Sequence, residues 1–168
     1  HLVSYPIRNG KDVNFVFSFS ESAFSKNSIQ SILSCHPILS LLEKRMKDWQ
    51  IISVKTSEPL FNWRRGSATL IGDAAHPMPP HLAQGAGQSF MDIACIETLL
   101  AKGFCVSDTL NEMIKIRMTE AHSVARKSQI SGDIFRTNGP VANLRNQIIG
   151  LAGGKIINEF LNDLWQLA

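Results

Sequence analysis

Residues 70–88, LIGDAAHPMPPHLAQGAGQ, hold the groups best suited to bind a ligand. Asp73 follows a predicted short strand, and a carboxylate at the C-terminal end of a strand can accept hydrogen bonds from the hydroxyls of a sugar or polyol. Gly72 lets a ligand approach the backbone closely. Gly85-Ala86-Gly87 opens the next predicted helix, where free N–H groups and the helix dipole favour negative charge. Each feature by itself is common, so a plain structural turn and a ligand site both stay open.

The part of the chain before this segment is rich in predicted β-strands. Asn9-Gly10 lies between two β-prone runs at 1–8 and 12–19, which predicts an antiparallel hairpin with one face more buried than the other. Helical periodicity over 27–49 predicts a helix that is broken or kinked at Pro37. A short strand is predicted at 51–54.

A predicted strand, loop and helix connect this N-terminal part to the C-terminal part of the chain. Arg64-Arg65-Gly66 predicts a turn, and residues 67–71 predict a short buried strand. After the stiff Pro-rich loop, a helix is predicted over 83–101, with Gly103 as its C-terminal stop.

The back of the chain is α-rich. Thr109-x-x-Glu112 has capping-box spacing and predicts a long helix that begins near Ser107 or Thr109. Its predicted apolar face consists of Leu110, Met113, Ile114, Ala121 and Val124, with Arg117, Glu120 and Lys127 mainly outside that face. After Gly139-Pro140, two shorter helices are predicted at 141–149 and 155–167, separated by the glycine-containing stretch 150–154.

Composition narrows the class of protein. The 168 residues include 17 Lys plus Arg and 14 Asp plus Glu, for a net charge of +3, and 44% are hydrophobic. These values indicate a folded globular protein, not a disordered one, and no apolar run is long enough to span a membrane. The weak positive charge argues against a nucleic-acid partner. The three cysteines match no zinc or redox motif, which favours a reducing, cytoplasmic compartment.

The string GDAAHP-x-x-P followed by QG resembles the second flavin-binding motif of the single-component FAD-dependent aromatic hydroxylases, the group of p-hydroxybenzoate hydroxylase and salicylate hydroxylase. Three flanking stretches agree. Residues 1–16 resemble the HxxxYPxR…G…NxV strand pair of the salicylate-hydroxylase-like branch. Trp63-Arg64-Arg65-Gly66 is similar to the W-x-x-G that precedes the motif, and Arg145-Asn146 resembles the C-terminal RN of the branch.

The resemblance implies FAD as the cofactor and NADH or NADPH as co-substrate. Asp73 would hydrogen-bond the ribityl hydroxyls of FAD, with Gly72 allowing the close approach. Pro80 would lie beside the reactive edge of the flavin. The amides of Gly85, Ala86 and Gly87 would face the pyrimidine end of the flavin ring and stabilise negative charge on reduced flavin, and Gln84 is assigned to the same site.

The resemblance also implies a substrate pocket. His1 and Tyr5 share one face of a strand and would line an aromatic pocket, where they could hydrogen-bond or help to deprotonate a phenol. A terminal histidine and a packed core tyrosine are the structural alternatives. His76 is expected to order the loop through hydrogen bonds, with a catalytic base as the alternative. The family's usual Ala-x-Glu-Asp-Ala reads Ser89 to Ile93 here, so its acidic pair is reduced to Asp92.

No G-x-G-x-x-G for the FAD pyrophosphate occurs, so we expect the C-terminal part of a longer enzyme with an α+β and α/β fold. Residues 1–63 would end a substrate-binding β-sheet domain, 64–105 would be an FAD-domain segment with the Gly-Asp motif, and 106–168 would be C-terminal helices.

The leading hypothesis for function is part of a flavoprotein monooxygenase that hydroxylates a salicylate-like aromatic with NAD(P)H and O₂, the chain being inactive alone. The alternatives are a non-catalytic remnant or interaction module, and a related FAD enzyme such as a halogenase or epoxidase. Expected partners are a small aromatic substrate and the missing N-terminal part, without nucleic acid or membrane; a homodimer stays open.

Overall fold

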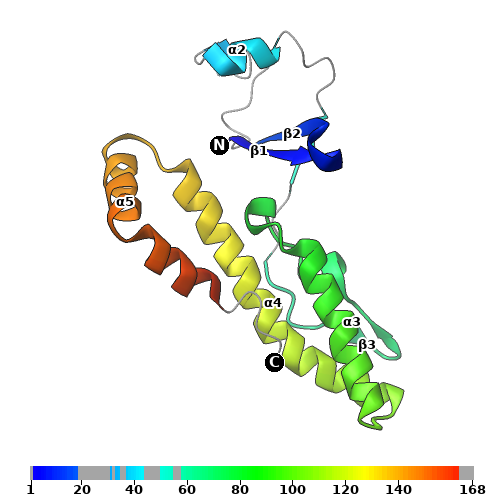
Figure 1. Cartoon of the computed structure of the whole chain (residues 1–168). Coiled ribbons are helices and arrows are strands. Elements are labelled where there is room, and N and C mark those ends of the chain that lie inside the picture. The colour runs from blue at the N-terminus through cyan, green and yellow to red at the C-terminus, as the bar shows by residue number, and fades with distance from the viewer. Residues whose placement is uncertain are drawn as a thin grey trace. The chain divides into compact units, whose positions relative to one another are not determined.

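The computed structural model of the chain describes residues 2–18, 31, 33–34, 37–43, 50–54 and 58–162 (Figure 1). The chain divides into two compact units, His1–Ser53 and Val54–Ala168, which are described separately below. These units reflect packing alone, so the predicted functional division at residues 63 and 105 stays a prediction.

The first unit contains the predicted hairpin. Strand β1 (Leu2–Ile7) pairs antiparallel with β2 (Asp12–Phe17), with Leu2 opposite Phe17 and Ile7 opposite Asp12. In the connecting turn η1 (Arg8–Gly10), Asn9 and Gly10 have φ values of 56° and 81°. Asparagine and glycine tolerate this left-handed backbone best, so the Asn-Gly pair forms the predicted turn.

The predicted difference between the faces of the hairpin is incomplete. Phe15 and Phe17 are half-buried, but Val13 on the same face is 52% exposed, and Asn14 on the other face is half-buried. A two-stranded sheet offers too few neighbouring strands to cover one face.

Helix α2 (Pro37–Glu43) begins at the proline that was predicted to break the helix over 27–49. Proline is tolerated in the first turn of a helix because the N–H that it lacks would have no partner there. Residues 27–30, 32, 35–36 and 44–49 of the predicted helix lie outside the described residues. The predicted strand at 51–54 is wrong: the segment has no regular structure, and Ile51 and Ile52 are 63% and 69% exposed. A β-prone run forms a strand only where another strand pairs with it.

The second unit begins with a small hairpin that corrects two predictions. Strands β3 (Arg64–Arg65) and β4 (Ala68–Thr69) pair antiparallel, and the turn between them is formed by Gly66 and Ser67. Arg64 and Arg65 are therefore strand residues and not the predicted turn. The predicted buried strand at 67–71 is only two residues long, and Leu70 and Ile71 are 40% and 39% exposed. This two-stranded ribbon has no wider sheet among the described residues to bury it.

Two short 3-10 turns, η3 (Gly72–Ala74) and η4 (Pro80–Leu82), lead into helix α3 (Gly85–Ala101). Helix α3 ends as predicted, since Gly103 takes a φ of 88° and donates its N–H to the Leu100 carbonyl at 2.9 Å. Helix α4 (Val106–Arg136) packs along α3 (Figure 1). The core between them contains Trp63, Ala75, Leu99, Met113 and Ala121.

The predicted capping box of α4 is wrong. The helix begins at Val106, one residue before Ser107 and three before Thr109, because Cys105 is extended and its sulfur accepts the Asp108 N–H at 3.5 Å. Thr109 is buried within the first turn and does not cap the helix.

The two predicted C-terminal helices are one helix, α5 (Gly139–Leu161), which runs through residues 150–154. Glycine in a helix interior costs only about 1 kcal/mol relative to alanine, so three glycines weaken the helix without ending it. Residues 163–168 lie outside the described part of the chain.

The glycines inside α5 should lower its stability. Gly150→Ala and Gly154→Ala should each raise the free energy of unfolding by about 0.5–1 kcal/mol, because a Cβ at either position meets nothing within 4 Å. Urea unfolding measures the change. Gly139→Ala is the matched control: its φ of 65° disfavours a side chain, so this substitution should destabilise the protein. A loss of stability in the first two variants would contradict a continuous α5.

Candidate functional site

The Gly72–Asp73 turn lies against helix α3. Gly72 is buried with a φ of 57°, and its N–H donates to Asp92 Oδ2 at 2.9 Å. Its carbonyl accepts the N–H groups of Ala75 and His76, both at 2.9 Å, which closes the turn. A Cβ on Gly72 would lie 2.7 Å from Ser89 Oγ on α3. Glycine is therefore required both for the backbone angle and for the contact with α3.

The Asp73 carboxylate lies beside the first turn of α3. Asp73 is exposed, and its Oδ1 lies 3.4 Å from the position of a Cβ built on Gly85. The side chain is therefore open to solvent while the backbone on its N-terminal side is buried. An exposed carboxylate held on a fixed turn can accept hydrogen bonds from the hydroxyls of a ligand.

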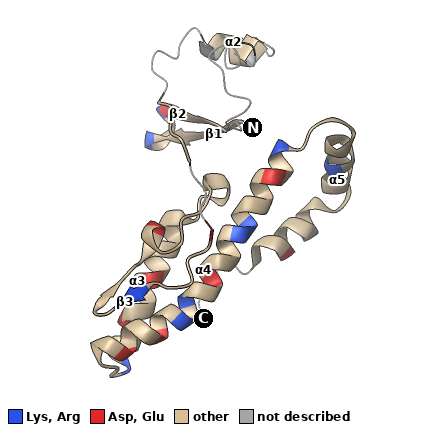
Figure 2. Ribbon diagram, turned by 180° about the vertical axis from the view of Figure 1, so that it is seen from behind, with Lys and Arg blue, Asp and Glu red and all other residues tan. Residues whose placement is uncertain are grey.

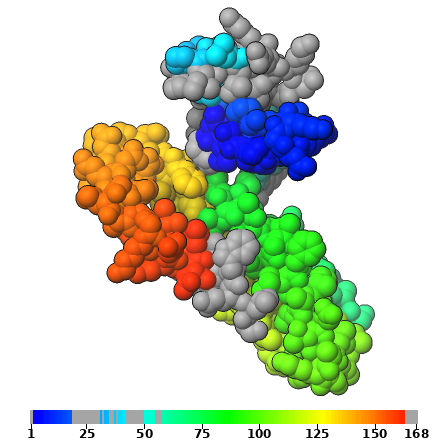
Figure 3. All heavy atoms as spheres, in the orientation of Figure 1, coloured from blue at the N-terminus to red at the C-terminus, as the bar shows by residue number. Residues whose placement is uncertain are grey.

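The N-terminus of α3 offers backbone donors next to Asp73. The first intrahelical hydrogen bond runs from the Gln88 N–H to the Gln84 carbonyl at 2.8 Å, so the amides of Gly85, Ala86 and Gly87 precede it. Gln84 is buried, and no side chain caps the helix at this residue. In the space-filling view, α3 and the loop before it both lie at the molecular surface (Figure 3). These amides can receive a negatively charged or carbonyl-bearing group.

A buried polar network lies behind this surface. The Asp92 side chain is 0% exposed and accepts hydrogen bonds from His76 Nε2 at 2.7 Å and from Arg117 Nε at 2.9 Å. Arg117 Nη2 also donates to Gln88 Oε1 at 2.6 Å, and its Nη1 donates to Glu120. Burial by itself would raise the pKa of Asp92, but the hydrogen bonds from His76, the Gly72 N–H and Arg117 outweigh it and hold the pKa below the ordinary value.

This network confirms one prediction and corrects another. His76 orders the Pro-rich loop through a hydrogen bond, as predicted. Arg117 was expected outside the apolar face of α4 but is 2% exposed. The sequence indicates this burial, because Arg117 lies four residues from Met113 and four from Ala121. Residues four apart share one face of a helix, and both are members of the predicted apolar face. A lone arginine on an apolar stripe needs a buried carboxylate, which Asp92 supplies.

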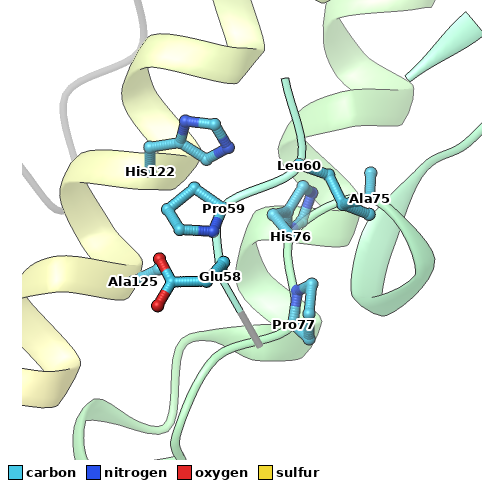
Figure 4. Close-up of a pocket in the computed structure, with 8 residues that line it drawn as sticks. All are labelled: Glu58, Pro59, Leu60, Ala75, His76, Pro77, His122 and Ala125. Atoms are coloured by element: carbon cyan, nitrogen blue, oxygen red, sulfur yellow. The ribbon is translucent and has the colours of Figure 1, made fainter. Parts of the chain in front are cut away.

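A small pocket lies behind the same loop. Figure 4 shows His122 and Ala125 on α4, with the segment Glu58–Leu60 and the segment Ala75–Pro77 forming the other walls. His122 stacks edge-on against Phe61, with ring centroids 5.3 Å apart, and against Trp63 at 6.0 Å. None of the predicted flavin-binding residues lines this pocket.

His122 should make stability depend on pH. Burial lowers the pKa of His122 below its ordinary value of 6.5 and the nearby His76 adds to the lowering, whereas a hydrogen bond with the Leu60 backbone partly opposes it. Below about pH 6.5 the unfolded chain binds a proton that the folded chain resists, so stability falls as the pH drops toward the folded-state pKa.

Thermal unfolding between pH 7.5 and 5 tests this expectation. His122→Gln should flatten the decline but not abolish it, since burial also lowers the pKa of His81. An unchanged pH profile in His122→Gln would contradict the assignment.

The other predicted site residues lie outside the Gly72–Asp73 turn and the start of α3. Pro80 is exposed at the start of η4. Tyr5 is 46% exposed, so it is not a packed core residue of its own unit, and its hydroxyl accepts a hydrogen bond from Asn14 Nδ2 at 2.7 Å. His1 lies outside the described residues. The structure thus brings together Gly72, Asp73 and the start of α3, while the roles of Pro80, Tyr5 and His1 stay predictions.

A model of the FAD binding domain family matches residues 20–127, more than half of the chain, including the Gly-Asp turn and the start of α3. The chain belongs to this family. The predicted resemblance to the FAD-dependent aromatic hydroxylases is confirmed at the level of the family, as is FAD as the cofactor. The mixed helices and strands are compatible with a part of the FAD hydroxylase fold.

Curated relatives agree with this family. The chain is 28% identical to a 3-hydroxybenzoate 6-hydroxylase of Aquipseudomonas alcaligenes, over 89% of the chain and 41% of that protein. It is 28% identical to the Klebsiella oxytoca 3-hydroxybenzoate 6-hydroxylase, over 95% and 42%. It is 24% identical to the salicylate hydroxylase of Pseudomonas putida, over 89% and 39%. The chain thus spans about two fifths of the length of these relatives.

Two further observations bear on partners. Charged residues of both signs follow one another along α4 (Figure 2), so this helix presents no surface of a single sign. Among the described helices, none is both long and apolar enough to cross a membrane.

Proposed function

We propose that this chain is part of a flavin-dependent monooxygenase that hydroxylates a small phenolic acid with NADH or NADPH and O₂. The proposal depends above all on the placement of Asp73, an exposed carboxylate next to the open amides of α3. The named substrates of the relatives, hydroxybenzoate and salicylate, support the phenolic-acid class.

The residues present fit the flavin. Gly85 keeps the space beside Asp73 free of a side chain, since a Cβ on Gly85 would lie 3.4 Å from Asp73 Oδ1. Asp73 would accept hydrogen bonds from the ribityl hydroxyls. The amides of Gly85–Gly87 would bind the pyrimidine end of the ring and, with the helix dipole, favour negative charge there. Bound and reduced, the flavin supplies the electrons that activate O₂.

Further roles follow from the same proposal. Pro80, exposed at the start of η4, would border the flavin edge, and Tyr5 with His1 would orient the phenol. Because the chain spans about two fifths of its relatives, we propose that the AMP end of FAD is bound elsewhere in the full-length protein and that this chain alone does not turn over.

Titration of FAD into the full-length protein, followed by quenching of flavin fluorescence, tests the cofactor site. Asp73→Asn should weaken FAD binding by about tenfold, since hydrogen bonds to a charged acceptor are the stronger ones. Glu97→Gln is the matched control: it makes the same charge change at an exposed residue of α3 and should leave the affinity unchanged. Equal affinities in both variants would refute the assignment of Asp73.

Product analysis tests the reaction. A phenolic acid should accelerate NADH or NADPH oxidation and yield a product with one added hydroxyl group. A halogenated or epoxidised product would instead identify a related flavin enzyme, and a full-length protein that binds no FAD would favour a non-catalytic module.

A further inference from the structure

We propose that Asp92 is a positioning residue for the flavin: its buried carboxylate holds the Gly72–Asp73 turn against α3 and so sets the place of Asp73. This inference rests on the proposed function, because it assigns Asp92 a role that is exerted through a flavin-binding residue. It concerns a residue that does not itself touch the ligand, since the Asp92 side chain is 0% exposed.

One carboxylate ties both ends of the turn to α3. Asp92 Oδ2 accepts the Gly72 N–H at 2.9 Å, immediately before Asp73, and His76 Nε2 at 2.7 Å, three residues after it. The residues on both sides of Asp73 are therefore anchored to the same oxygen atom. Asp73 lies between these anchors with its own side chain exposed, so the two anchors limit where its carboxylate can lie.

Arg117 supports the same carboxylate and the start of α3 together. Its Nε donates to Asp92 Oδ1 at 2.9 Å, and its Nη2 donates to Gln88 Oε1 at 2.6 Å. Gln88 Nε2 in turn donates to Gln84 Oε1 at 3.4 Å, at the residue that precedes α3. The arginine fork thus links the Asp73 turn to the helix end whose amides would bind the flavin ring.

The network needs a carboxylate at position 92. All three groups that face Asp92 are donors, and an ionised carboxylate accepts on both oxygens. In Asp92→Asn, one acceptor becomes an NH₂ group, which must face either Arg117 or the pair formed by Gly72 and His76. The substitution preserves the shape of the side chain but releases one side of the network.

The test uses the full-length protein and two probes, FAD and an FAD analogue whose ribityl chain lacks hydroxyl groups. The wild-type protein should bind FAD more tightly than the analogue, because Asp73 bonds the hydroxyls. In Asp92→Asn, FAD binding should weaken by about tenfold while binding of the analogue changes less than twofold, with circular dichroism showing a folded protein. A general loss of structure would weaken both probes equally.

A double variant checks that Asp92 acts through Asp73. The double variant Asp73→Asn, Asp92→Asn should bind FAD no more than twofold more weakly than Asp73→Asn alone. The carboxylate that Asp92 positions is already absent in Asp73→Asn, so Asp92→Asn can cause little further loss. Effects that multiply would overturn the proposal, as would a folded Asp92→Asn protein with wild-type affinity and wild-type discrimination. Glu97→Gln serves as the control on α3.

Arg117→Lys provides a second route if Asp92→Asn does not fold. Lysine keeps the charge, but its single ammonium group cannot bond Asp92 and Gln88 together as the planar guanidinium does. The same loss of preference for FAD over the analogue is therefore expected. Failure of both variants to fold would also overturn the proposal, since the network would then be a requirement for folding. A wild-type protein that does not bind FAD, or that does not distinguish FAD from the analogue, would instead refute the proposed function.

Discussion

Asp92→Ala should lower the free energy of unfolding by about 3–5 kcal/mol, because it leaves Arg117 buried without its main carboxylate. The Arg117 side chain is 2% exposed, so water cannot replace the lost partner. Glu120 hydrogen-bonds to the same arginine but is itself 31% exposed, and it compensates only part of the charge. The loss should therefore exceed that of an exposed ion pair, which is about 0–1 kcal/mol.

Urea unfolding in the absence of flavin measures this effect. Glu97→Ala removes an exposed acid from the same helix and should change stability by less than about 0.5 kcal/mol. A loss below about 1 kcal/mol in Asp92→Ala would show that Arg117 reaches solvent, contrary to its burial.

The acid dependence of stability should change as well. Since the network holds the pKa of Asp92 below its ordinary value of 3.8, the stability it contributes is present above pH 3.8 and is lost as the pH falls through the folded-state pKa. Asp92→Ala should therefore flatten the acid limb of the stability profile, in a pH range well below the one in which His122 acts.

Gly72→Ala should have the second largest effect, a loss of about 2–5 kcal/mol. Two causes add: a side chain at a φ of 57° costs about 1–2 kcal/mol, and the new Cβ would lie 2.7 Å from Ser89 Oγ, an overpacked contact that costs about 1–3 kcal/mol. The substitution should also displace Asp73 and weaken FAD binding.

Two variants separate these causes. Gly66→Ala has a similar φ of 61° but meets nothing within 4 Å, so it should show only the backbone cost. Adding Ser89→Ala to Gly72→Ala removes the hydroxyl and should recover part of the lost stability, since Ser89 Cβ is 3.4 Å away. Equal losses of stability in Gly66→Ala and Gly72→Ala would mean that α3 moves to accommodate the new side chain. The chemical denaturation curves of the three proteins decide between these results.

The local features of the fold were predictable where one residue type has a strong backbone preference. Asn9 and Gly10 occupy the left-handed turn of the hairpin, Gly103 ends α3, and Pro37 begins α2. Each depends on the preference of a single residue and needs no distant partner. The strand at 51–54 and the buried strand at 67–71 failed because strands and their burial depend on neighbours that a local pattern does not contain.

The sequence by itself determined the family and the Gly-Asp motif, because Gly72, Asp73 and the glycines at the start of α3 lie close together in the chain and are recognised without distant residues. Only the tertiary structure decided what supports that motif. Gly72, His76, Asp92 and Arg117 come from the turn, α3 and α4, up to 45 positions apart (117 − 72), and no local period relates them. The burial of Arg117 depends on the position of Asp92 across the α3–α4 contact, since a charge leaves water only where a partner of opposite charge lies within hydrogen-bonding distance.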